Sequence, residues 1–286
     1  QKQFTKLFAE TDYADDIILL NPTRNSSCEM LQICEQFSHE YNIEFNASKS
    51  RLMIFGKRQL QAEIVFQGMR IPQVNIEKHV GNLLGTDRFI CNVRVNEACN
   101  DLYVKFNLLV RQFGKCSPRV LYRLFNTYCT SFFGNQLWDY ADVSLIETVS
   151  VAWRKCVRRI FDLPYNAHCN LLHLLCDDST IKVKLHKRFL RFFFGLSKSN
   201  NAIVSRLSKT VLDGSRSTTC ASINFICSLY NIDKYNLTLR NLVKVQDINS
   251  EGDRRTAQII SDFIDYKVWN PDNDHLSVII ENLCTS

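Results

Sequence analysis

Two adjacent carboxylates, Asp15 and Asp16, complete the tetrapeptide Tyr13-Ala14-Asp15-Asp16 and stand directly before the apolar residues 17–20. A short apolar run of this kind is typical of a buried strand. Two carboxylates about 4 Å apart repel each other by roughly 4 kcal/mol at an effective dielectric constant near 20. A divalent cation with oxygen ligands would offset this repulsion, so the pair predicts a metal site at the end of a strand.

The charge is concentrated in the middle of the chain. Residues 102–209 carry 17 Lys and Arg against 6 Asp and Glu, a net charge of +11, whereas the whole chain carries +6. A basic block between two slightly acidic flanks indicates a surface for a polyanion, and nucleic acid is the usual one. The alternative is a basic helix face that serves only solubility.

The acidic pair must be positioned by an α/β layer. A capping-box spacing, Ser26 to Glu29, predicts a helix over residues 26–42. We expect its apolar stripe to lie on the sheet that carries the aspartates; the stripe comprises Met30, Ile33, Cys34, Phe37 and Tyr41. Residues 51–56 predict a strand and residues 64–74 a hairpin, and a short apolar segment bracketed by glycines follows at 79–85.

Helices should dominate after residue 87. The pattern predicts them over residues 88–113, 117–138, 148–162, 180–197, 255–266 and 274–284. In the segment 117–138, one stripe contains Leu121, Leu124, Phe125, Tyr128 and Phe132. The segment 148–162 places an apolar set inward, namely Val149, Trp153, Cys156, Val157, Ile160 and Phe161, and a basic set outward, namely Arg154, Lys155, Arg158 and Arg159. Trp153 is expected in the core rather than as a platform for a base.

The twelve cysteines are scattered, with no CxxC pair, and the chain opens without a secretory signal. We therefore expect reduced cysteines in a cytoplasmic or nuclear protein that is not secreted. No apolar stretch approaches about 20 residues, so no membrane partner is expected. The group Cys169, His173 and Cys176 fits no standard zinc spacing and predicts a buried leucine helix instead.

The order of these motifs resembles the second half of the palm of reverse transcriptases, specifically those of non-LTR (LINE-type, jockey-like) retrotransposons. Tyr13 to Asp16 is similar to the Tyr-x-Asp-Asp metal-binding turn of that family, Phe45-Asn46 to Lys49-Ser50 to its lysine motif, and residues 79–83 to its primer grip. The resemblance continues to the end of the chain, in Tyr128-Cys129, Leu137-Trp138-Asp139, Ala152-Trp153-Arg154-Lys155, residues 158–164, His168 and residues 283–286.

The resemblance implies an α+β fold. Residues 1–86 would form a partial polymerase palm of antiparallel strands with a packing helix. Residues 87–165 would form a helical thumb, and residues 166–286 a helical carboxy-terminal region. The family's third metal-binding carboxylate and its fingers are not matched before Tyr13. We therefore expect a fragment of the enzyme, of unknown oligomeric state.

The activity implied is RNA-directed DNA polymerisation on an RNA template and DNA primer, with dNTP substrates and two Mg2+ ions. Asp15 would be a direct metal ligand, Asp16 a supporting ligand, and Lys49 would lie near the phosphates of the incoming nucleotide. The nucleic-acid contacts implied come from Tyr13, Gly81, Asn82, Arg154, Lys155, Arg158 and Arg159. The main alternative is a catalytically inactive remnant that binds nucleic acid. An unrelated helical interaction domain would leave the ordered motifs unexplained.

Overall fold

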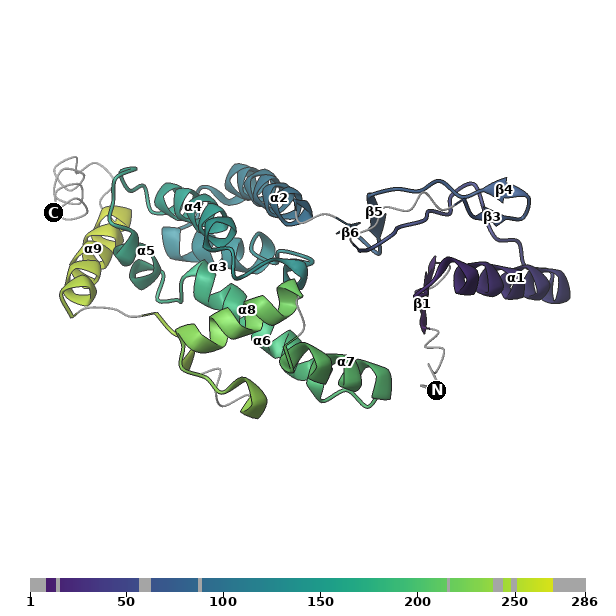
Figure 1. Ribbon diagram of the computed structural model, residues 1–286. Helices are drawn as coiled ribbons and strands as arrows, with labels where there is room; N and C mark the ends of the chain where they lie inside the picture. The colour runs from purple at the N-terminus through teal and green to yellow at the C-terminus, as the bar shows by residue number, and fades with distance from the viewer. Residues whose placement is uncertain are drawn as a thin grey trace. The chain divides into compact units, whose positions relative to one another are not determined.

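The structure is a computed structural model that describes residues 9–13, 16–56, 63–86, 89–214, 217–238, 244–247 and 251–269 (Figure 1). The chain divides into two compact units, Gln1–Ile90 and Cys91–Ser286, which we call the sheet-bearing unit and the helical unit. The fold mixes helices with small antiparallel sheets, as the expected α+β class requires.

The strands of the sheet-bearing unit form two-stranded antiparallel sheets. In the first, β1 (Ala9–Tyr13) pairs with β2 (Asp16–Leu20), and Tyr13 lies opposite Asp16. Tyr13 and Asp16, the first and last residues of the acidic tetrapeptide, therefore lie at the end of this hairpin.

Two further hairpins have tight turns. β3 (Val65–Phe66) pairs with β4 (Met69–Arg70), which confirms the hairpin predicted over residues 64–74. β5 (Ile76–His79) pairs with β6 (Asn82–Gly85). In both, two residues with positive φ join the strands, namely Gln67 (48°) and Gly68 (72°), and Val80 (46°) and Gly81 (76°). Positive φ at both positions is the signature of a type I′ turn.

The predicted strand over residues 51–56 is wrong. Only Leu52 pairs there, in an isolated bridge to Gln73. The Leu52 N–H donates to the Pro72 carbonyl at 3.0 Å, and the Val74 N–H donates to the Leu52 carbonyl at 2.9 Å. Pro72 has no N–H of its own, so the ladder cannot extend through it.

The predicted helix over residues 26–42 is confirmed as α1 (Arg24–Tyr41), but its start and its buried face differ from expectation. Thr23 is the N-cap, because its hydroxyl accepts from the Ser26 N–H at 3.2 Å. Ile33 is 62% exposed and Tyr41 57% exposed, so only part of the predicted stripe, Met30 and Cys34, is covered where α1 contacts β2 and β3. The residues that do pack on the small core are Leu31 and Cys34; that core consists of Ala47, Ile64, Phe66 and Ile71.

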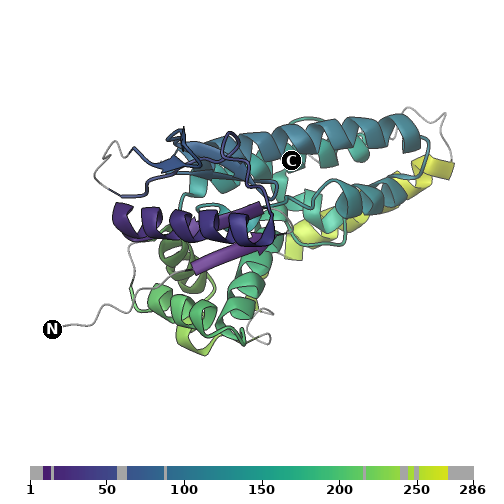
Figure 2. The same cartoon turned by 90° about the vertical axis from the view of Figure 1, so that its right-hand side faces the viewer.

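The helical unit is built from consecutive helices (Figures 1 and 2). They are α2 (Ile90–Phe113), α3 (Pro118–Tyr128), α4 (Val143–Ile160), α5 (Cys169–Leu175), α6 (Ile181–Ser197), α7 (Ala202–Leu212), α8 (Thr218–Leu229) and α9 (Glu251–Trp269), with 3-10 turns η1 (Asn135–Leu137) and η2 (Lys234–Asn236). α6 contacts α4 and α7, and α5 contacts α9.

Helices α4 and α6 supply much of the core of this unit. Every residue of the inward set predicted for α4 is buried, and Trp153 is only 2% exposed. The predicted position of Trp153 in the core is therefore confirmed. α6 is buried along most of its circumference, through Ile181, Val183, Leu185, His186, Phe189, Leu190 and Phe193.

Several helix boundaries depart from expectation. α3 ends at Tyr128, not at residue 138, and Tyr128 is 65% exposed. The chain turns soon afterwards, where Phe132 and Gly134 both have positive φ. α7 and α8 were not predicted; they begin at the side-chain caps of Asn201 and Ser217. The helix predicted over residues 274–284 lies outside the described residues.

Candidate nucleic-acid interface

The acidic hairpin is described in part. Tyr13 and Asp16 are paired across β1 and β2, and the Asp16 side chain is exposed. Asp15 lies outside the described residues, as does the side chain of Tyr13. The described residues contain no group of three or more side chains able to hold a metal ion. The predicted ligand Asp16 is therefore at the surface, next to the end of the hairpin.

Lys49 lies on a polar turn that is held by hydrogen bonds and by a buried alanine, Ala47. The Asn46 side-chain oxygen accepts from the Ser48 hydroxyl at 2.7 Å and from the Lys49 N–H at 3.1 Å, and these two hydrogen bonds hold the turn. Ala47, in the same turn, is buried in the small core. The Lys49 side chain is exposed and forms no ion pair with any residue that the structure describes, so no contact joins it to Asp16.

Gly81 and Asn82 lie at the tip of the hairpin formed by β5 and β6. The Asn82 amide donates to the Val80 carbonyl at 3.4 Å. Val80 has a φ of 46°, a conformation that is rare and strained for a β-branched residue. The segment predicted to be a primer grip therefore forms a strained, tightly turned tip.

A basic groove lies on the helical unit, along the carboxy-terminal half of α4. Its volume is about 530 Å³. It is lined by Val151, Arg154, Lys155, Arg158, Arg159, Asp162, Leu163, Tyr165 and Cys169. The lining thus contains all four cations of the outward set predicted from the sequence and one carboxylate.

Three of the four cations also contact other residues of the helical unit. Arg154 forms an ion pair with Glu147. Arg158 donates from Nη2 to the Ala167 carbonyl at 2.7 Å. Arg159 donates from Nη1 to the Asn107 side-chain oxygen at 2.9 Å, and its guanidinium lies 5.5 Å from the centre of the Phe106 ring.

Lys155 differs from these three arginines. It is exposed, and it forms no hydrogen bond or ion pair with any residue in the described part of the chain. Its charge is therefore the one most directly available to a ligand in the groove. Arg158 and Arg159 can still contribute positive potential, because the groups that they contact are neutral, whereas the charge of Arg154 is largely offset by Glu147.

The end of α4 fixes one wall of the groove. Asp162 has a φ of 52°, and the Leu163 N–H donates to the Arg158 carbonyl at 2.9 Å, the arrangement of a Schellman motif. A turn follows in which the Ala167 N–H donates to the Pro164 carbonyl at 3.1 Å. Because Arg158 binds the Ala167 carbonyl, this turn is attached to the helix that carries the cations. Tyr165, in the turn, was not predicted as a site residue; it is 89% exposed.

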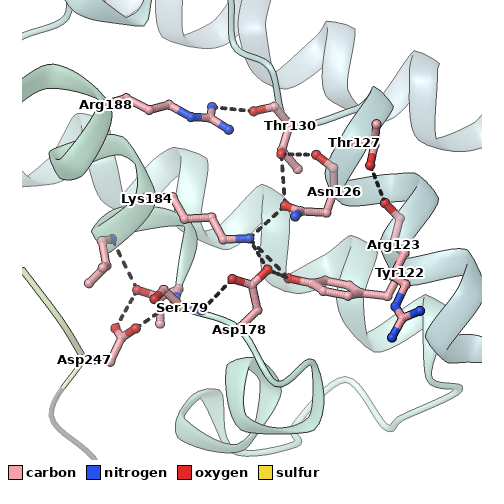
Figure 3. Close-up of polar contacts among 12 residues, drawn as sticks. Tyr122, Arg123, Asn126, Thr127, Thr130, Asp178, Ser179, Lys184, Arg188 and Asp247 are labelled. Atoms are coloured by element: carbon pink, nitrogen blue, oxygen red, sulfur yellow. Dashed lines mark hydrogen bonds and ion pairs between the residues drawn. The ribbon is translucent and has the colours of Figure 1, made fainter. Parts of the chain in front are cut away.

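The cations of α6 are used differently, as Figure 3 shows. Lys184 binds Asp178 and donates to the Asn126 side-chain oxygen at 2.7 Å. The Tyr122 hydroxyl donates to Asp178 at 3.0 Å. Burial, followed by the charges of Cys176 and Asp178, raises the pKa of Tyr122, so its hydroxyl stays protonated and can donate. Lys184 thus joins α3 to α6.

Two more polar contacts extend this network. Arg188 donates to the Thr130 carbonyl at 2.6 Å, just after α3. The Thr180 N–H and hydroxyl donate to the two carboxylate oxygens of Asp247 at 2.9 and 2.7 Å, next to the start of α6. Two of the five cations of α6, Lys184 and Arg188, therefore stabilise the helical unit internally, and the basic groove of α4 is the better candidate for a ligand.

The cysteines described by the structure are free thiols. Burial raises the pKa of Cys129 to about 11 and that of Cys156 to about 12, so both remain protonated and unreactive near neutral pH. The predicted leucine helix is confirmed as α5, with Leu171, Leu172 and Leu175 buried. No helix that the structure describes is long and apolar enough to cross a membrane.

Comparison of the chain with known proteins does not identify it. No protein-family model matches, and searches of curated proteins and of solved structures also give no match.

Proposed function

We propose that this chain is the carboxy-terminal part of a reverse transcriptase of the non-LTR retrotransposon type, and that it binds nucleic acid through the basic groove. The resemblance rests on the order of the motifs. It is supported by Tyr13 and Asp16, the first and last residues of the acidic tetrapeptide, which lie opposite each other at the end of a hairpin. The binding proposal is carried by one observation, the gathering of Arg154, Lys155, Arg158 and Arg159 along one groove.

In this proposal the acidic hairpin contributes to the polymerase centre of the complete enzyme. The exposed carboxylate of Asp16 is a hard oxygen donor of the type that Mg2+ prefers, and Asp15 would be the second. Bound Mg2+ would stabilise negative charge on the reacting phosphate. Lys49, exposed on its turn, would place a proton donor near the leaving pyrophosphate. Sheet-bearing residues 1–86 would then be palm, and residues 87–165 and 166–286 thumb and carboxy-terminal region.

The groove would hold nucleic acid by its phosphates. Contacts between Lys or Arg and phosphate oxygens give affinity that does not depend on base sequence and that decreases as salt is added. A direct test measures the anisotropy of a fluorescently labelled oligonucleotide titrated with the whole chain. Lys155→Glu should weaken binding at least about tenfold at low salt, because it replaces an attractive charge by a repulsive one.

The matched control is Lys209→Glu, which makes the same charge change at an exposed residue of α7 outside the groove. It should weaken binding by less than about threefold, since only long-range, screened repulsion is added. Equal effects of the two variants would show that the groove is not the binding surface.

A second candidate function is that of a nucleic-acid-binding remnant without catalysis. It is favoured by the composition of the groove, whose cations belong to the helical unit and require nothing from the acidic hairpin. Primer extension on an RNA template with Mg2+ separates the two candidates. We expect no synthesis by residues 1–286 alone, because two carboxylates do not complete a two-metal site. Robust synthesis that Asp15→Asn abolishes would show an active polymerase and contradict this expectation.

A further inference from the structure

One wall of the basic groove carries an exposed aromatic ring, that of Tyr165. Tyr165 is 89% exposed, and its hydroxyl makes no hydrogen bond to any residue that the structure describes. Aromatic side chains usually stabilise a protein by burying a large apolar area. Tyr165 buries little of its ring, so it contributes little to the stability of the fold. The ring nevertheless lines the groove together with the four cations.

The position of Tyr165 is fixed by the backbone around it. The residue lies between the two ends of the hydrogen bond from the Ala167 N–H to the Pro164 carbonyl, at 3.1 Å. Pro164 restricts φ at its own position, and Arg158 binds the Ala167 carbonyl at 2.7 Å. The Schellman motif at Asp162 holds the preceding segment to α4. An exposed ring is therefore carried by a well-anchored backbone turn, so a ligand that contacts the ring has to order only the side chain.

From these observations we propose that the groove binds a single strand of nucleic acid, with its phosphates along Lys155 and the arginines and one base stacked on the ring of Tyr165. This inference rests on the proposed nucleic-acid binding and adds the form of nucleic acid. A positively charged groove with an aromatic platform is the usual combination for single strands, because an unpaired base has a free face. In a duplex the base faces are already covered by their neighbours, so the ring would gain nothing there.

Three probes of equal length separate phosphate binding from stacking: a single-stranded oligonucleotide, the same strand with abasic sites throughout, and the duplex. The whole chain should bind the single strand at least about fivefold more tightly than the abasic strand. This ratio is equivalent to about 1 kcal/mol, the lower end of what stacking of one base contributes.

Variants of Tyr165 give the decisive comparison. Tyr165→Ala should remove the preference for the single strand over the abasic strand and change duplex binding by less than about twofold. Tyr165→Phe should keep the preference, because the ring remains. Equal losses for Tyr165→Ala and Tyr165→Phe would assign the contact to the hydroxyl and overturn stacking.

The same titrations show which proposal fails. If the chain binds all three probes with a dependence on Lys155 but with no effect of bases or of Tyr165, the stacking inference is wrong and the proposed groove stands. If the chain binds none of the probes, both are wrong. If Tyr165→Ala weakens all three probes equally, the ring supports the shape of the groove and does not stack.

Discussion

The stability of the helical unit should depend on pH through His186. This residue of α6 is fully buried, its Nδ1 lies 2.9 Å from the Tyr230 hydroxyl, and its Nε2 has no partner in the described part of the protein. The rings of Tyr140, Phe225 and Tyr230 surround it. Burial, and to a smaller extent the charge of Lys182, lowers the pKa of His186 to about 3.

The direction of this pH dependence follows from the difference in proton binding between the folded and unfolded states. In the unfolded chain His186 takes up a proton near its ordinary pKa of about 6.5, whereas the folded protein keeps it neutral down to about pH 3. The unfolded state therefore binds more protons between these values, and the folded state loses stability as the pH falls below about 6.5. Between pH 7 and pH 5 the contribution of this one group is a loss of about 2 kcal/mol.

The assay is urea-induced unfolding followed by far-UV circular dichroism at pH 7 and pH 5, for the parent chain and for His186→Gln. Gln does not titrate and can still bind the Tyr230 hydroxyl. The variant should lose about 2 kcal/mol less than the parent between the two pH values, and the other titrating groups, including Glu147 and Lys182 near the ring, cancel in the difference. An identical loss in both proteins would refute the assignment.

Two further changes test the hairpin and the polar network. Val80→Asn should raise the free energy of unfolding of the sheet-bearing unit by about 1 kcal/mol, because Asn tolerates the positive φ that strains valine; thermal unfolding measures this, and an unchanged or lower midpoint would contradict it. Lys184→Met leaves the half-buried Asp178 without its cation and should lower the free energy of unfolding by about 2 kcal/mol after allowance for partial exposure. Lys187→Met, on the same helix, is the control and should change it by less than about 0.5 kcal/mol; similar losses in both variants would show that the network is not the cause.

The sequence is most informative where periodicity and burial agree. In α4 the apolar residues recur at helical spacing along the whole helix, and this pattern alone predicts the residues that are buried. The stripe of α1 has the same periodicity, yet Ile33 and Tyr41 are exposed. Periodicity shows which residues share a face, and whether another element covers that face depends on contacts that are distant in the sequence.

The groove shows the same limit. The run from Arg154 to Arg159 predicts a basic outer face, and the structure confirms that face. The partners of Arg158 and Arg159 could not be predicted, because Ala167 follows a turn and Asn107 lies 52 residues before Arg159 on another helix. The one sequence signal for Tyr165 is its position directly after Pro164, which is typical of a turn. The exposure of its ring depends on how the turn is attached to α4, which the sequence does not predict.

The most direct test of the account is the salt dependence of single-strand binding, measured for the parent chain, Lys155→Ala and Lys209→Ala. If Lys155 contacts one phosphate in the groove, its removal should reduce the slope of log affinity against log salt concentration by about 0.7, the value expected for one contact to a single strand. Lys209→Ala should leave the slope unchanged. A parent chain that does not bind, or a slope that is the same with and without Lys155, would contradict the assignment of the basic groove as a nucleic-acid interface.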